Sequence, residues 1–84
     1  MNDVYTSGDS LELDARGLFC PEPVMLLHKK IREVEVGQQI LVIATDPATE
    51  RDVVKFCRFL GHDLLSAGKH GDEYHYRIVK LDNE

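Results

Sequence analysis

The residues of this 84-residue chain that could carry out chemistry centre on Cys20, in the run Cys20-Pro21-Glu22-Pro23. Proline disfavours helical backbone in the residue before it and is tolerated in a first helical turn. We therefore expect Cys20 at the start of a helix, where the positive end of the helix dipole lowers the pKa of a thiol and raises its thiolate fraction. Because the prolines remove N–H donors and Glu22 adds a negative charge, we predict only moderate activation.

Four neighbours form the predicted supporting frame of Cys20: Pro21, Glu22, Pro23 and Arg16. The prolines stiffen the loop, so that a partner meets a cysteine already held in place. Arg16 precedes Cys20 in a glycine-containing turn, from which its guanidinium could offset the charge of Glu22. The alternative is that Cys20 is only a small apolar residue at a helix start.

Two other features of the helices bear on this site. Cys57 falls on an apolar helical stripe with Val53, Phe56 and Leu60, which predicts a core position; a redox pair with Cys20 is the alternative. Met25 and Leu26 depart from the inward stripe of their helix one turn after Cys20. We predict that they form a partner-docking surface, unless a rotation of the helix buries Met25.

Several chemistries lack the residues that they need. The four histidines (His28, His62, His70 and His75) and two cysteines do not fall at metal-ligand spacing, and no phosphate-binding glycine loop or nucleophile triad is present, so we expect no metal and no cofactor. A net charge of −5 disfavours direct nucleic-acid binding. The apolar runs are too short to span a membrane and the N-terminus is polar, so we expect a cytoplasmic protein away from membranes.

The elements that must position Cys20 alternate along the chain. Apolar periodicity predicts strands over residues 10–14, 39–45, 62–67 and 73–81, and helices over residues 21–34 and 46–60. Asp46 is the predicted N-cap of the second helix, with Pro47 at its first position. A loop of several residues, 68–72, joins the last two strands as a hairpin and contains His70.

This order predicts an α+β fold, a two-layer α/β sandwich in the order β-α-β-α-β-β, with a four-stranded mixed sheet and two helices on one face. A right-handed crossover makes the first two strands parallel, so both helices begin at the same edge of the sheet. Cys20 and Asp46 should meet there, where ligand sites gather, and Asp46 could then also shape the surroundings of Cys20. We expect one domain over residues 1–84, with residues 1–9 as a flexible extension.

Residues 13–23, read as LDARGLFCPEP, closely resemble the signature of the TusA, or SirA-like, sulfur carrier family. The resemblance continues through Val24-Met25, residues 44–49, Asp52, Phe56-Cys57 and Gly61-His62, and so covers nearly the whole chain. It implies the same two-layer sandwich. It also implies that Cys20 carries a persulfide, whereas Cys57 matches a position that carries no sulfur.

The resemblance implies a relay function. Cys20 would accept sulfur from a cysteine desulfurase and pass it to a downstream sulfur-relay protein, in the best-known branch of the family towards 2-thiouridine at tRNA wobble positions. Relatives that feed molybdenum-cofactor or sulfur-oxidation pathways are an alternative branch. A regulatory interaction module with a structural Cys20, or a redox sensor with a Cys20–Cys57 bond, are the alternatives from other classes. The carrier would be a sulfurtransferase-type shuttle rather than a stand-alone enzyme.

Overall fold

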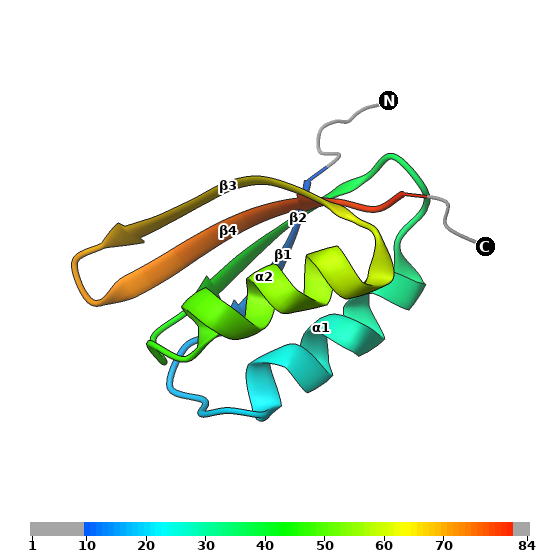
Figure 1. Ribbon diagram of the computed structural model, residues 1–84. Helices are drawn as coiled ribbons and strands as arrows, with labels where there is room; N and C mark the ends of the chain where they lie inside the picture. The colour runs from blue at the N-terminus through cyan, green and yellow to red at the C-terminus, as the bar shows by residue number, and fades with distance from the viewer. Residues whose placement is uncertain (1–9, 82–84) are drawn as a thin grey trace.

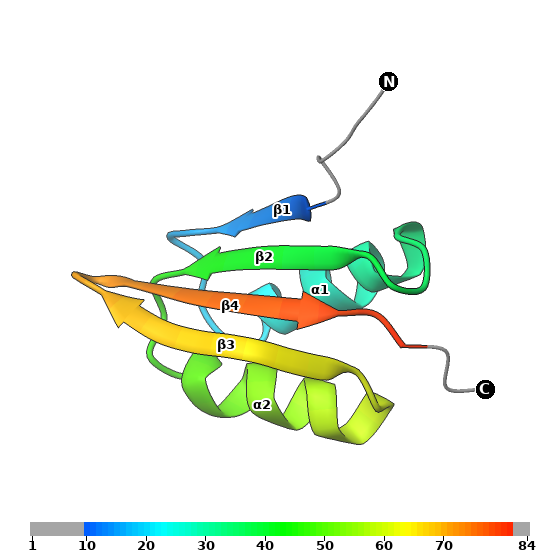
Figure 2. The same ribbon diagram turned by 90° about the horizontal axis from the view of Figure 1, so that it is seen from above.

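The computed structural model describes residues 10–81, and the predicted flexible extension at residues 1–9 lies outside the described residues. Two helices cover one face of a four-stranded sheet (Figure 1), whose strand order β1-β2-β4-β3 can be followed in Figure 2. The elements are β1 (Ser10–Ala15), α1 (Glu22–Glu33), β2 (Gln39–Ala44), α2 (Thr49–Leu60), β3 (Asp63–His70) and β4 (Glu73–Val79). The predicted order and two-layer architecture are confirmed.

The sheet is mixed, as the crossover argument requires. β1 and β2 are parallel, with Leu13 opposite Val42, whereas β4 runs antiparallel to both β2 and β3. A parallel pair needs a long connection, and α1 supplies it. The carboxyl ends of β1 and β2 therefore lie side by side, and the loops that follow them share one edge of the sheet.

The core lies between the sheet and the helices. In β4, alternation places Tyr74, Tyr76 and Ile78 in the interior, with Ile78 fully buried. The cluster is formed by Leu27, Ile31, Val34, Ile40, Val42, Val53, Phe56, Cys57, Tyr74, Tyr76 and Ile78. The apolar stripes of both helices are therefore used for packing, which fixes the faces that remain at the surface.

The start of α2 differs from the prediction. The helix begins at Thr49 after an N-cap at Ala48, so Asp46 is not its cap. The residues before it form tight turns, in which the carbonyls of Asp46 and Pro47 accept hydrogen bonds from residues three positions later, at 3.0 and 3.1 Å. The Asp46 side chain instead accepts from the Ala48 N–H at 3.1 Å and is free to contact a second segment.

The hairpin is also tighter than predicted. β3 extends to His70, which pairs with Glu73, so only Gly71 and Asp72 form the turn. Gly71 adopts a φ of 67°, the left-handed conformation that two-residue hairpin turns require and that glycine adopts without strain. His70 is consequently a strand residue, and its ring lies 4.5 Å from that of His75.

Candidate functional site

Cys20 lies in the loop between β1 and α1, exposed to solvent, at the edge where β1 and β2 end. Its backbone N–H donates a hydrogen bond of 2.7 Å to Oδ2 of Asp46, which follows β2. A second bond ties the same two segments, because the Gly17 N–H donates to Oγ1 of Thr45 at 2.8 Å. The prediction that Cys20 and Asp46 meet at this edge, with Asp46 shaping the surroundings of the thiol, is confirmed.

The prolines frame the start of α1. Pro21 is the N-cap residue and Pro23 is buried in the first turn, so Cys20 precedes the cap by one residue. Proline fits this first turn, where an N–H would have no helical partner. The turn is closed by the Glu22 N–H, which donates to the Phe19 carbonyl at 2.9 Å, and by the Met25 N–H, which donates to the Pro21 carbonyl at 3.1 Å. Cys20 is therefore held by backbone bonds on both sides.

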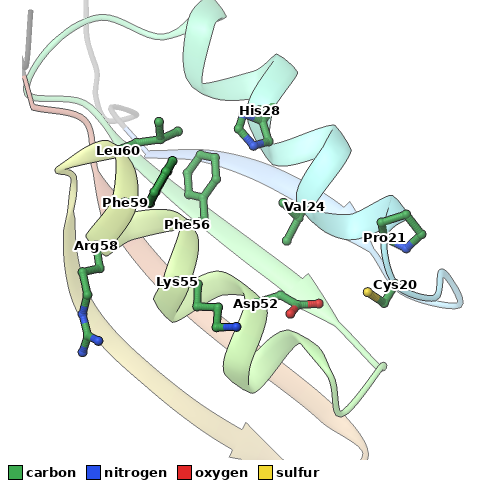
Figure 3. A pocket seen from close by; sticks show the side chains of 10 residues that line it. All are labelled: Cys20, Pro21, Val24, His28, Asp52, Lys55, Phe56, Arg58, Phe59 and Leu60. Carbon is green, nitrogen blue, oxygen red and sulfur yellow. The ribbon is translucent and has the colours of Figure 1, made fainter.

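A groove of about 730 Å³ runs between α1 and α2, with Cys20 at one end (Figure 3). It is lined by Cys20, Pro21, Val24, His28, Asp52, Lys55, Phe56, Arg58, Phe59 and Leu60. In Figure 3 the Cys20 sulfur points across the mouth of the groove towards Asp52, while Phe59 and Leu60 lie at the far end. The thiol thus faces a surface that two helices build together.

Acidic neighbours dominate the electrostatics of the thiol. The Asp52 carboxylate, placed to accept a hydrogen bond from the thiol, raises the pKa of the thiol above its ordinary value; desolvation and the charges of Asp52 and Asp46 add to this rise. Arg51 acts in the opposite direction. The predicted moderate activation by the helix dipole is therefore wrong for the free protein, because nearby carboxylates outweigh it.

Arg16 departs from its predicted place in the frame. Its guanidinium donates to both carboxylate oxygens of Asp14, at 2.9 and 3.0 Å, and to Oε2 of Glu73 at 3.4 Å. These contacts lower the pKa of Asp14 to about 2 and raise that of Arg16. Arg16 is thus engaged by carboxylates of β1 and β4 and does not offset the charge of Glu22 beside the thiol.

The second cysteine is sharply different from the first. Cys57 is only 4% exposed and belongs to the core cluster. Burial, with a smaller effect of the Asp63 charge, raises the pKa of its thiol to about 11. Both cysteines are free thiols. The predicted core position of Cys57 is confirmed, and Cys20 is the accessible sulfur.

The surface around the groove carries large apolar side chains. Met25 is 60% exposed, so the helix is not rotated to bury it, while Leu26 is half-buried. Phe19, at 70%, and Phe59, at 89%, are more exposed still. Sequence reasoning did not single out Phe59 for the site, although Asp52, Phe56 and Phe59 recur at the spacing of one helical face and could have been found by it.

The histidines contact neighbouring residues in two separate parts of the fold. His28 makes an edge-on contact with Phe56, at 4.8 Å between ring centres, and His62 accepts a hydrogen bond from the Leu81 N–H at 3.0 Å. His75 contacts Oε1 of Glu73 at 3.0 Å. Among residues 10–81 no three histidine, cysteine, aspartate or glutamate side chains are arranged to hold a metal ion. Within the same range, neither helix has the length and apolar character needed to cross a membrane.

The fold and the site together define a class: a small two-layer α/β protein that presents one accessible cysteine at the mouth of an interhelical groove. A solved structure shares this fold, that of a SirA-like protein from Desulfitobacterium hafniense. It superposes with a TM-score of 0.74 at 23% identity and covers 86% of this chain and 99% of that one.

Sequence comparison identifies the family within this class. The model of the family described as Sulfurtransferase TusA matches residues 11–80. The Sulfur carrier protein TusA of Pseudomonas syringae pv. syringae (strain B728a) is 55% identical over 69 residues, covering 82% of each chain. That of Pseudomonas entomophila (strain L48) is 57% identical over 68 residues, or 81% of this chain and 85% of the relative. The chain belongs to the TusA family of sulfur carrier proteins.

Proposed function

We propose that Cys20 is the sulfur-bearing residue of a carrier that accepts persulfide sulfur from a cysteine desulfurase and passes it to a downstream relay protein. The observation that carries this proposal is the contrast between the two thiols. Cys20 is exposed and faces a groove, whereas Cys57 is packed in the core. A partner's cysteine can reach only the first without unfolding part of α2.

The chemistry needs a thiol and a partner, and no group bound to this chain. In the uptake step, the Cys20 thiolate attacks the terminal sulfur of the donor persulfide. A new S–S bond forms at Cys20, the S–S bond of the donor breaks, and the electron pair leaves with the donor's own cysteine. The proton that Cys20 lost is matched by the proton that the donor's cysteine takes up. The step therefore leaves a persulfide on Cys20 and a thiol on the donor. Delivery to the acceptor repeats this exchange in the opposite sense.

The surface around Cys20 suits transient protein partners. Met25, one turn after Cys20 in the sequence, and Phe59, at the far end of the groove, are exposed apolar groups. Such groups supply much of the binding energy of protein interfaces when a partner covers them. Leu26, half-buried beside Met25, extends the predicted docking surface. The net charge of −5 favours a route in which the relay protein, and not this chain, meets the nucleic acid.

The test of the carrier step is mass spectrometry of the purified protein. After incubation with a cysteine desulfurase, cysteine and pyridoxal phosphate, Cys20 should gain the mass of one sulfur atom. Cys20→Ser should gain none, and Cys57→Ala, the matched control, should be loaded as the unaltered protein is. Failure of the unaltered protein with several desulfurases would overturn the proposal, and a modification shifted to Cys57 would overturn the assignment of the site.

We infer that the pathway is 2-thiolation of the tRNA wobble uridine, which is what the family resemblance implies. The measurement is the wobble thiouridine content of tRNA in a strain that lacks this protein, complemented with either the unaltered protein or Cys20→Ser. Only the unaltered protein should restore the modification. If thiolation persists in the deletion strain, the molybdenum-cofactor or sulfur-oxidation branch replaces it; if Cys20→Ser restores thiolation, Cys20 is structural and the chain acts as an interaction module.

A further inference from the structure

Two carboxylates lie close to Cys20: that of Asp46, in a loop 26 positions later in the sequence, and that of Asp52, in a helix 32 positions later. Asp46 is only 9% exposed and binds the Cys20 N–H through Oδ2. Asp52 lies in the first turn of α2, its side chain 18% exposed, and faces the sulfur across the mouth of the groove (Figure 3). We call these two residues the acidic pair. Because both carboxylates are less exposed than most surface charges, their effect on the sulfur is screened less than that of a fully exposed group.

The other charged groups around the thiol do not cancel the acidic pair. Arg51 lies next to Asp52, with 3.4 Å between its Nε and Oδ1 of Asp52, but its side chain is 65% exposed and therefore well screened. Lys55 and His28 line the groove further from its mouth, and Glu22 begins α1 with a further negative charge. The balance is reflected in the raised pKa of the Cys20 thiol, whose largest cause is the Asp52 carboxylate acting as a hydrogen-bond acceptor.

We propose that the acidic pair, chiefly Asp52, is a gate that slows the reaction of Cys20 with small thiols and electrophiles while the carrier is between partners. This inference rests on the proposed function for its purpose, since a carrier must keep its sulfur until the acceptor arrives. Its chemistry concerns the thiol itself and can be measured without any partner.

The gate acts on both states of the carrier. In the empty state, the carboxylates favour the thiol over the thiolate, and only the thiolate is a strong nucleophile. In the loaded state, a small thiolate that attacks the terminal sulfur forms a new S–S bond with it and breaks its bond to Cys20. The electron pair of the broken bond stays on Cys20, which leaves as a thiolate and then takes a proton from water. Carboxylates beside this leaving group raise its basicity, and a more basic thiolate leaves more slowly.

Asp52→Asn tests the gate with an isosteric change that removes one charge. We expect iodoacetamide to alkylate Cys20 of this variant, identified by peptide mapping, faster at pH 7.5 than Cys20 of the unaltered protein. Each tenfold gain in the thiolate fraction should raise the alkylation rate only about threefold, because a less basic thiolate is also a weaker nucleophile. Glu50→Gln is the matched control, since this substitution removes the same charge from the same helical turn. Glu50 lies on the other side of α2, near Tyr74 and Tyr76. The rate of the Glu50→Gln variant should equal that of the unaltered protein.

Arg51→Ala gives a prediction of opposite sign at an exposed position where misfolding is not expected. Removing this cation should slow alkylation of Cys20, because Arg51 lowers the pKa of the thiol. The gate is overturned if Asp52→Asn is alkylated no faster than Glu50→Gln. A slower rate in Asp52→Asn would also overturn it, since the carboxylate would then be acting as the base that activates the thiol.

Loss of loaded sulfur provides the second readout. Loaded Asp52→Asn should release its terminal sulfur to 2-mercaptoethanol several-fold faster than loaded Glu50→Gln, a difference that the lower basicity of the leaving thiolate predicts. Equal release would refute protection of the persulfide. If a desulfurase loads no form of the protein, the carrier function fails, but the alkylation rates still decide whether the acidic pair restrains the thiol.

Discussion

Replacing Tyr76 by phenylalanine should lower the free energy of unfolding by about 1 kcal/mol, because it deletes one buried hydrogen bond without changing the shape of the core. Tyr76 and Thr49 are each 1% exposed, and their hydroxyl oxygens lie 2.8 Å apart. The Thr49 hydroxyl gives its proton to the Asp46 carbonyl at 2.7 Å, so Tyr76 must be the donor to Thr49. This series of hydrogen bonds connects the core to the loop whose Asp46 side chain holds the Cys20 backbone.

Thr49→Val should cost more, about 2 to 3 kcal/mol, since it leaves the buried Tyr76 hydroxyl without its partner and removes one of the two hydrogen bonds that the Asp46 carbonyl accepts from Thr49. The double variant should cost less than the sum of the two single changes by about 1 kcal/mol, because valine then has no orphaned tyrosine hydroxyl beside it. Urea unfolding followed by circular dichroism gives the free energy of unfolding of all four proteins. In thermal unfolding of the same proteins, each kcal/mol should appear as a shift of about 4 to 8 °C in Tm. Strictly additive changes, or a Tyr76→Phe protein as stable as the parent, would refute the hydrogen-bonded chain.

Three further outcomes follow from the site and the core. Phe59→Ser, at a position 89% exposed, should leave the free energy of unfolding unchanged but reduce kcat/KM for sulfur uptake from a desulfurase about tenfold, as loss of an aromatic interface contact does. The control is Val36→Ser, at an exposed position away from the groove. Equal uptake by both variants would show that Phe59 is not part of the docking surface. Hydrogen bonds from the N–H groups of Cys20 and Ala48 lower the pKa of Asp46, so the Asp46 carboxylate binds a proton more weakly in the folded state than in the unfolded state. The ionised carboxylate therefore stabilises the fold above the ordinary carboxyl pKa, and this stabilisation is lost as the pH falls through the lowered pKa. Urea midpoints measured between about pH 5 and 2 should therefore decline less steeply for Asp46→Asn, and parallel curves would contradict this linkage. Cys57→Ala should lower the free energy of unfolding by about 1 to 2 kcal/mol through lost packing, with sulfur loading at Cys20 intact; an unchanged stability would contradict its core role.

The fold could be predicted from the sequence because its main signals are local. Local patterns indicate which side of each element is buried. Examples are the alternation of Tyr74, Tyr76 and Ile78 in a strand and the helical spacing of Leu27 and Ile31. The handedness of the crossover then leaves one arrangement for the parallel pair, and the edge shared by Cys20 and Asp46 follows from it.

The surroundings of the thiol could not be predicted in the same way, because they depend on how elements distant in the sequence face each other. Asp52 affects Cys20 only because α2 packs beside the start of α1, a tertiary contact between segments 32 positions apart that no local pattern specifies. Arg16 has a local carboxylate partner in Asp14, and this bidentate contact prevails over any reach towards the cysteine. The reactivity of the thiol is therefore set by charges that the tertiary structure, and not the local sequence, brings close to it.

The direction of the strands also determines where the protein can be tethered. Ser10 pairs with Gln39 and Gln39 with Val79, so the described chain enters and leaves the sheet at one end. Cys20 follows the opposite end of β1, about 20 Å away along six strand residues. A fluorescent label, a solid support or an additional domain attached where the described chain enters or leaves the sheet would lie at the end of the strands opposite Cys20, and the thiol would remain accessible. Immobilised copies should accordingly exchange sulfur as readily as free ones.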